Sequence, residues 1–271
     1  MKKKILAIIL AAAIIFCMAA CGDSSQEKES NSSSASSPAV SNAPKAASEP
    51  VDTPEKNLQG NTDSDKSGSE EYEITYSNVK TYTNSIGTTY AQVIVEIENT
   101  GTTDLYLSSG SYDLEDENGK LITSNSMVTT RPEVISPGEK AYMYEEDMLD
   151  EAVEGGLRVL PRPSVEKAKV DNIRYSVTDL EIAPDKFGGL KARGRVENTT
   201  SEDADGMVYV AIILKNAQGA PIGQVFTIIT EDLPAGSKIG FEASGMSLPD
   251  DVTSDSVAET AAYAYPLQFQ F

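Results

Sequence analysis

Hydrophobic and polar residues alternate with a period of two in two separate stretches of the chain. In residues 190–197, apolar or small residues occupy every second position, and charged residues occupy the positions between them. Residues 91–97 show the same alternation, except that the apolar Ile94 lies on the polar side. A period of two is typical of a β-strand. We therefore expect two strands, each with one buried and one solvated face.

These two stretches belong to an internal repeat. Each strand leads into the triplet Glu-Asn-Thr, which centres on Asn99 in the first copy and on Asn198 in the second. The next hairpin glycine follows after 20 residues (Gly119) and after 21 residues (Gly219). A shift of one residue would turn the inward side chains outward, so the shared register indicates a shared fold. The Asn is typical of a turn, since its side chain bonds nearby backbone amides and tolerates left-handed dihedral angles.

A hairpin pattern follows in both copies. Residues 112–122 (YDLEDENGKLI) and 212–222 (IILKNAQGAPI) each read as two strands around a polar turn that contains Gly. Proline and glycine mark a further turn before the expected strands at 140–144 and 238–243. Short strands with turns every 8 to 12 residues or so are typical of a β-sandwich. The sequence therefore predicts an all-β fold with two tandem antiparallel β-sandwiches.

A strand ending in Asn, an aromatic or aliphatic residue two before a Leu, a polar hairpin ending in Gly, and a Pro/Gly turn together resemble the FxLYD domain of bacterial surface proteins. The motif positions fall on Tyr112, Leu114, Glu115 and Asp116, and on Ile212, Leu214, Lys215 and Asn216. The Phe is replaced in both copies, and the Tyr is Glu or Lys. The resemblance implies an immunoglobulin-like sandwich without known catalysis, in which the motif residues are structural.

We expect the first sandwich at residues 72–170 and the second at 171–271. Residues 157–170 would close the first sandwich as an edge strand, since their prolines cannot donate to a central ladder. The acidic segment 143–156 is compatible with a helical turn. If the two sandwiches fold independently, the substitution Gly119→Val destabilises the first one alone.

Residues 1–20 have a different pattern. Three lysines precede a twelve-residue apolar run, Ile5–Phe16, as in a signal peptide. The run is too short to cross a membrane, which takes roughly 20 apolar residues. Two alanines then precede Cys21, and this order resembles the lipobox of bacterial lipoproteins, with Met18 where Leu is usual. The resemblance implies cleavage before Cys21 and attachment of a diacylglycerol to its thiol; the alternative is a free thiol after an ordinary secretory signal.

The anchor would place the protein on the outer face of the bacterial cytoplasmic membrane, with its body in the extracytoplasmic space. Cys17 lies in the segment that would be removed, so no disulfide is expected. Residues 22–71 are rich in Ser, Ala, Pro, Asn and charged residues, which predicts a disordered tether from Cys21 to residue 71 with a reach of roughly 40 Å. A partner-binding segment is the alternative.

The chain carries 22 basic and 42 acidic residues, a formal net charge of −20. This charge argues against binding to nucleic acid or to anionic lipid headgroups. The chain has no His, so a common general base and zinc ligand is missing. We expect no catalytic residue, no cofactor and no metal.

Two features deserve weighing as ligand sites. Residues 113–119 (DLEDENG) are rich in carboxylates, but Gly stands seventh where a calcium-binding EF-hand loop has it sixth, which favours a solvated hairpin tip. Tyrosines recur at period two, at Tyr142 with Tyr144 and at Tyr263 with Tyr265. Exposed tyrosine ladders bind sugars or peptides, whereas buried ones are ordinary packing; packing is favoured here.

Three functions remain open from the sequence. The leading one is a non-enzymatic binding or adhesion module for an envelope or extracellular protein or polysaccharide. The second is a passive spacer or assembly subunit, and the third is a carboxylate-based hydrolase of wall glycans.

Overall fold

A computed structural model shows how the chain folds. It describes residues 71–84, 86–150, 153, 155–186, 189–204, 206–245 and 248–268. The expected signal peptide, Cys21 and the expected tether up to residue 70 all lie outside the described residues.

The part of the described chain up to residue 167 forms strands β1 to β10. These are β1 (Tyr72–Thr83), β2 (Thr89–Asn99), β3 (Leu105–Leu107), β4 (Gly110–Asp116), β5 (Leu121–Val128), β6 (Thr130–Arg131), β7 (Val134–Ile135), β8 (Lys140–Met148), β9 (Leu157–Arg162) and β10 (Val165–Lys167).

The remaining part forms six strands and one short 3₁₀ helix. These are β11 (Ser176–Pro184), β12 (Leu190–Glu197), β13 (Val208–Lys215), β14 (Pro221–Ile229), β15 (Lys238–Ser244), η1 (Ser254–Ser256) and β16 (Glu259–Pro266).

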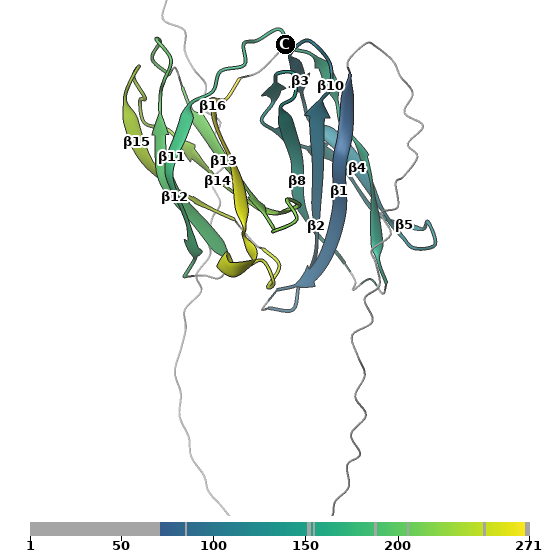
Figure 1. Ribbon diagram of the computed structural model, residues 1–271. Helices are drawn as coiled ribbons and strands as arrows, with labels where there is room; N and C mark the ends of the chain where they lie inside the picture. The colour runs from purple at the N-terminus through teal and green to yellow at the C-terminus, as the bar shows by residue number, and fades with distance from the viewer. Residues whose placement is uncertain are drawn as a thin grey trace, which may run out of the picture. The chain divides into compact units, whose positions relative to one another are not determined.

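All pairings between these strands are antiparallel, and no α-helix occurs among the described residues. Strands β1 to β10 form three sheets with the orders β1-β2-β8-β6, β10-β3-β7 and β5-β4-β9 (Figure 1). Strands β11 to β16 form a single sheet with the order β11-β12-β15-β14-β13-β16. The predicted all-β, antiparallel fold is therefore confirmed.

Each half of the described chain has its own hydrophobic core. One core draws its fully buried side chains from residues 91–159, and the other draws them from residues 175–264. In the second half, β14 and β15 pair only through Phe226 and Ser244, so the sheet folds over and encloses its core. The backbone N–H of Tyr175, just before β11, donates to the carbonyl oxygen of Ala264 in β16 at 2.7 Å. This bridge joins the two ends of the sheet.

Asn99 is buried at the end of β2, where its side chain ties three backbone groups together. Its Nδ2 donates to the carbonyl oxygens of Thr103 and Ile135, both at 2.9 Å. Its Oδ1 accepts the backbone N–H of Gly101 at 3.0 Å. The residue therefore holds the loop after β2 against the end of β7.

Asn198 makes the same bonds at the end of β12. Its Nδ2 donates to the carbonyl oxygens of Glu202 at 2.8 Å and Leu233 at 2.9 Å, and its Oδ1 accepts the Thr200 N–H at 3.0 Å. Neither Asn adopts a left-handed conformation, since Asp179 is the one described non-glycine residue with positive φ. The same bonds therefore recur at the equivalent position of both copies, and the Asn acts through its side chain and not through an unusual backbone conformation.

The described part of the acidic segment 143–156 is not helical. Residues 143–148 continue β8 as an extended strand paired with β2. Met143 packs in the first core, while Tyr144 lies on the opposite face of the strand. The period of two therefore persists through residue 148, and the helical turn considered for residues 143–156 does not occur among the described residues of that segment.

The outer face of β2 also differs from expectation. Gln92, Ile94 and Glu96 were expected to meet solvent, yet all three are buried. Strand β13 is likewise buried on both faces, because Val210 and Ile212 enter the second core while Tyr209, Ala211 and Ile213 are buried on the other side. One face of each strand packs in the core of its own half, and another part of the chain must therefore cover the opposite face.

Candidate functional site

The acidic hairpin at residues 113–119 uses its carboxylates for turn structure. Asp116 Oδ1 accepts the backbone N–H groups of Asn118 at 2.8 Å and Lys120 at 2.9 Å. The bond from the Lys120 N–H, and after it the bond from the Asn118 N–H, holds the pKa of Asp116 below its ordinary value. Asn216 Oδ1 accepts two backbone N–H groups in the same way in the second copy. The uncharged amide of Asn216 thus makes the same bonds as the carboxylate of Asp116, which indicates that both side chains stabilise the turn and do not bind a charged ligand.

Asp113 has a different partner. Its Oδ2 accepts a hydrogen bond from Arg162 Nη1 at 2.8 Å, and its Oδ1 accepts the Ser124 hydroxyl at 2.6 Å. The Arg162 guanidinium, then the Ser124 hydroxyl, holds the pKa of the Asp113 carboxyl below its ordinary value. In the described part of the chain, no group of three or more His, Cys, Asp or Glu residues is arranged to hold a metal ion.

The four tyrosines singled out from the sequence lie on two strands that face each other. The rings of Tyr142 on β8 and Tyr263 on β16 have centroids 6.2 Å apart. Tyr142 is 1% exposed and Tyr265 is 3% exposed. These two rings therefore pack inside the molecule, and because Tyr144 and Tyr263 are half-buried, the four tyrosines form no fully exposed ladder for a sugar or peptide.

A charged cluster lies beside this tyrosine pair. Glu96 accepts hydrogen bonds from Tyr142 Oη at 2.9 Å, from Thr75 Oγ1 at 2.7 Å, and from Lys140 Nζ. Lys215 Nζ, from the other half of the described chain, lies 3.5 Å from Glu96 Oε2. Burial alone would raise the pKa of Glu96, but the bonds from Lys140, Thr75 and Tyr142 hold it below its ordinary value.

The outer face of β2 and β8 thus meets the outer face of β13 and β16, and we call this contact the junction. Lys215 also lies over the Tyr142 ring, with its Nζ 5.8 Å from the centroid, and Arg131 lies 4.7 Å over the ring of Tyr209. The described residues of both halves belong to one compact unit, in keeping with these interactions. The junction explains the burial of both faces of β2 and β13.

The connection between β10 and β11 is fastened to the first repeat. Asn172 Nδ2 donates to Glu139 Oε2 at 2.7 Å and to Ser136 Oγ at 2.8 Å. Arg174 Nη2 lies 3.3 Å from the same Glu139 oxygen and also donates to the Val134 carbonyl oxygen. These bonds hold the connection in a fixed path.

Glu146 is the carboxylate whose pKa comes nearest to neutrality. Burial, partly opposed by a hydrogen bond from Tyr144, raises its pKa to about 7. The Tyr144 hydroxyl donates to Glu146 Oε1 at 2.6 Å and accepts a bond from Gln92 Nε2 at 3.1 Å. A carboxyl group with such a pKa can exchange protons near neutral pH. However, Glu146 lines neither of the hollows described below, and its close partners are side chains of its own sheet.

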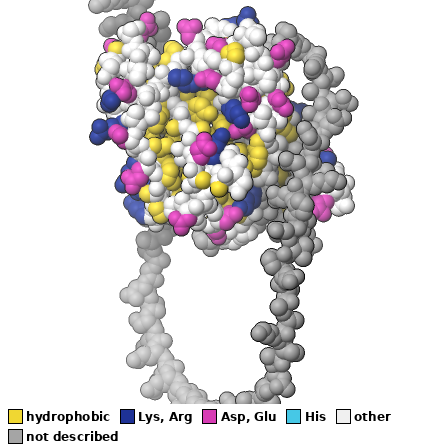
Figure 2. Space-filling view, viewed as in Figure 1, with side chains coloured by type: hydrophobic (Ala, Val, Ile, Leu, Met, Phe, Trp, Pro, Cys, Tyr) yellow, Lys and Arg dark blue, Asp and Glu magenta, His cyan; other side chains and the backbone are white. Residues whose placement is uncertain are grey.

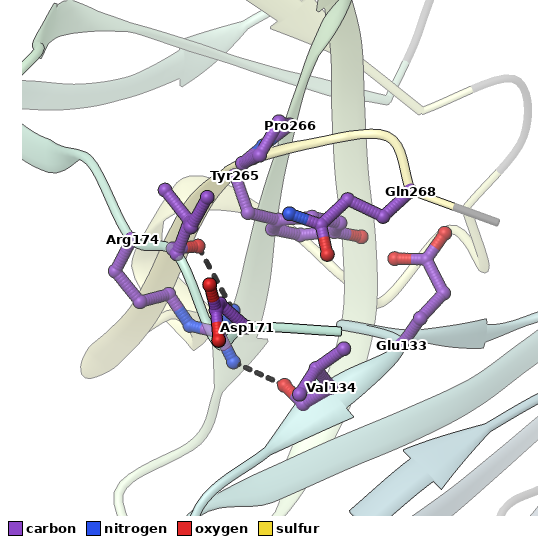
Figure 3. A pocket seen from close by; sticks show the side chains of 8 residues that line it. Glu133, Val134, Asp171, Arg174, Tyr265, Pro266 and Gln268 are labelled. Atoms are coloured by element: carbon purple, nitrogen blue, oxygen red, sulfur yellow. Dashed lines mark hydrogen bonds between the residues drawn. The ribbon is translucent and has the colours of Figure 1, made fainter. Parts of the chain in front are cut away.

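One hollow lies beside the connection, between Arg174, Tyr265, Gln268 and Glu133 (Figure 3). Its volume of about 10 Å³ is close to that of a single water-sized probe. Figure 3 shows the Gln268 side chain lying beside the Tyr265 ring, and Arg174 reaching the Val134 carbonyl. This hollow has no room for an organic substrate.

A larger hollow, of about 210 Å³, lies at the end of the second core. Its apolar lining comes from Leu190, Leu248 and Val252, while Asp250 and Ser254 supply polar groups. Leu248 and Val252 belong to the second core and thereby hold the loop in place.

The loop that forms this hollow is longer than its counterpart in the first repeat. It has 14 residues (245–258) between β15 and β16, against 8 residues (149–156) between β8 and β9. Asp251 pairs with Lys80 of β1, whereas Asp250 makes no hydrogen bond or ion pair with any described residue. Loops of this kind often carry function because the scaffold holds them rigidly.

Sequence reasoning missed both the charged cluster and this loop. Glu96 interrupts the apolar run VIVEI, and Lys215 ends the apolar run VYVAIIL, so each marks a charge beside buried strands. The longer loop was visible as a difference in spacing between the two copies.

Comparisons with known proteins add little. No family model matches the chain, and no curated protein does. A calcium-binding mutant of Bacteroides uniformis beta-glucuronidase 2 is similar to 63% of this chain at 15% identity and a TM-score of 0.19, and the match spans 23% of that chain. Within the described residues, no helix is long and apolar enough to cross a membrane.

Proposed function

We propose that this protein is a non-enzymatic binding module that a lipid on Cys21 holds at the outer face of a bacterial cytoplasmic membrane. Residues 22–71 would serve as its tether, and residues 72–170 and 171–271 as two FxLYD-like, immunoglobulin-like domains. The lipobox-like order of residues 1–21 supports the anchor, and the repeated bonds of Asn99 and Asn198 support two related domains.

The arrangement of charged groups supports binding over catalysis. Glu96, Asp113 and Asp116 hold sheets and turns together through bonds to neighbouring residues. On the face seen in Figure 2, basic and acidic side chains are interspersed around hydrophobic ones, with no extended area of one sign. Such a face suits protein or polysaccharide partners better than a polyanion.

The observation that carries the proposal is the extended loop over the 210 Å³ hollow. Asp250 and Ser254 are available there, and the apolar anchors Leu248 and Val252 fix residues 248–254 before any partner arrives. A loop ordered in advance loses less entropy on binding. We therefore place the binding surface at residues 248–254.

A photo-crosslinking side chain at Ser254 of the full-length protein on cells tests this proposal, with the same side chain at Ser126 of β5 as the control. We expect one envelope or extracellular component to be captured from position 254 and not from position 126. Capture at neither position would favour a passive spacer. Turnover of labelled peptidoglycan fragments by the purified protein would favour a hydrolase, and either result would overturn the proposal.

A further inference from the structure

The repeat allows each face of the junction to be compared with its equivalent in the other copy. On the β2/β8 side, Ile94 lies five residues before Asn99 and is 2% exposed. Its equivalent on β12, Arg193, donates to Glu242 at 2.6 Å, with a side chain that is 57% exposed. One repeat thus has an apolar face where the other has a charged one.

Tyrosine positions change in the same way. Tyr142 pairs with Glu96 across β8 and β2, and the equivalent pair across β15 and β12 is Gly240 with Arg195. Gly240 provides no ring for a partner sheet to pack against. The β12/β15 face therefore lacks what the β2/β8 face uses at the junction.

The opposite side of the junction shows a reciprocal change. Ile213 of β13 is buried and lies three residues before the turn residue Asn216. Its equivalent on β4 is Asp113, three residues before the turn residue Asp116. Tyr263 of β16 pairs with Ala211 of β13. The equivalent pair in the first repeat is Arg162 of β9 with Ser111 of β4, and the Arg162 side chain is 54% exposed. The outward β4/β9 face thus carries ion pairs where β13/β16 carries apolar and aromatic side chains.

We infer that the junction is a specific docking interaction between unlike faces of the two repeats, and that the stack closes after two. The β2/β8 face accepts the β13/β16 face of the same chain. A heterologous contact of this kind would continue indefinitely if both faces recurred on every repeat. Here the outward faces carry charges, which end the stack as a polar terminal repeat does in a solenoid.

The charges explain the selectivity. Docking a second copy on the β12/β15 face would bury Arg195 and the Arg193–Glu242 pair away from water, and the cost of desolvating such charges can exceed the attraction between them. Within the junction, Lys215 meets Glu96 instead, so this largely buried cation from the second repeat has a partner. The pair also fixes the register in which the two faces meet.

A nicked form of the full-length protein tests this inference. A protease site inserted between Lys169 and Val170 would be cleaved in the folded protein, and size-exclusion chromatography at micromolar concentration would show whether the fragments stay together. We expect co-elution as a single 1:1 complex. Fragments that separate although circular dichroism shows each one folded would overturn the inference, as would concentration-dependent growth to larger assemblies.

Two matched variants sharpen the result. Ile94→Arg places the second repeat's residue in the junction and should abolish co-elution, while Arg193→Ile makes the reverse exchange on the outward face and should leave it unchanged. If Ile94→Arg prevents folding, the charge exchange Glu96→Lys with Lys215→Glu provides the test. Each single change should weaken co-elution, and the pair together should restore part of it; equal weakening in all three would contradict a specific junction.

Discussion

Lys215 and Glu96 come from different repeats, yet Nζ of Lys215 lies 3.5 Å from Oε2 of Glu96 where both side chains are largely buried. Lys140 bonds the same carboxylate from within the first repeat. Glu96 therefore joins two cations that are 75 positions apart in the chain. Its carboxylate is the point at which the repeats are coupled electrostatically.

Lys215→Met should destabilise the protein by about 1 to 3 kcal/mol, because Glu96 loses one partner while Lys140 remains. Urea unfolding measures the change. Lys238→Met is the control, since its pair with Glu197 is exposed and such pairs are worth about 0 to 1 kcal/mol. Equal losses for the two variants would contradict a special role for Lys215.

Asn198→Ala should lower the free energy of unfolding by about 1 to 3 kcal/mol. The change leaves the N–H of Thr200 without its partner, and an unsatisfied buried group costs roughly that much. The carbonyl oxygens of Leu233 and Glu202 keep their bonds from the Ala204 N–H and the Thr200 hydroxyl. Thermal unfolding of Asn198→Ala beside the exposed Asn118→Ala checks this. A loss below that of the control would show that water replaces the side chain.

Glu146 predicts a pH dependence of stability. Its pKa rises from an ordinary value of 4.5 to about 7 in the folded protein, so the folded state holds the proton more tightly. The resulting stabilisation is complete below about pH 4.5 and is lost as the pH rises through 7. Glu146→Gln should flatten the decline between pH 5 and 8, by at most about 3 kcal/mol. Glu73→Gln, an exposed change on β1, should leave the profile as it is.

Gly119→Val tests whether the repeats unfold together. Gly119 has φ of 79°, which a β-branched residue adopts at a cost of roughly 1 to 3 kcal/mol. Independent domains would show two calorimetric transitions, with only the first lowered. The shared burial at the junction predicts one transition at a lower temperature. Two separate transitions would contradict coupling through the junction.

Cys21→Ser tests the proposed anchor. A thiol is needed to form the thioether with diacylglycerol, so the variant should move from the membrane fraction into the medium. Immunoblots of fractionated cells measure this. Retention of the variant on membranes would show that something other than the Cys21 lipid holds the protein.

The strands and turns were predictable because their signals are local. Alternation at residues 190–197, the Asn at 99 and 198, and the hairpin glycines each act within a few neighbouring residues. Residues 143–148 of the acidic segment were misjudged, because their composition obscured a period of two that β8 preserves.

The junction was not predictable in the same way. Ile94 stood out as an apolar residue on an outer face, and the apolar run in β13 is typical of a strand buried on both faces. Neither pattern says which surface covers which. That information lies in the match between Glu96 and Lys215, which only the folded arrangement brings together.

The order of the two repeats along the chain has a consequence for biosynthesis. Ribosomes complete Ile94 and Tyr142 before any residue of β13 or β16 exists. At roughly 5 to 20 residues per second, the nascent chain waits for about 5 to 20 seconds before its last hundred residues can cover that surface. During this interval the apolar face of β2 and β8 is uncovered and prone to associate with other chains, until the C-terminal repeat covers it.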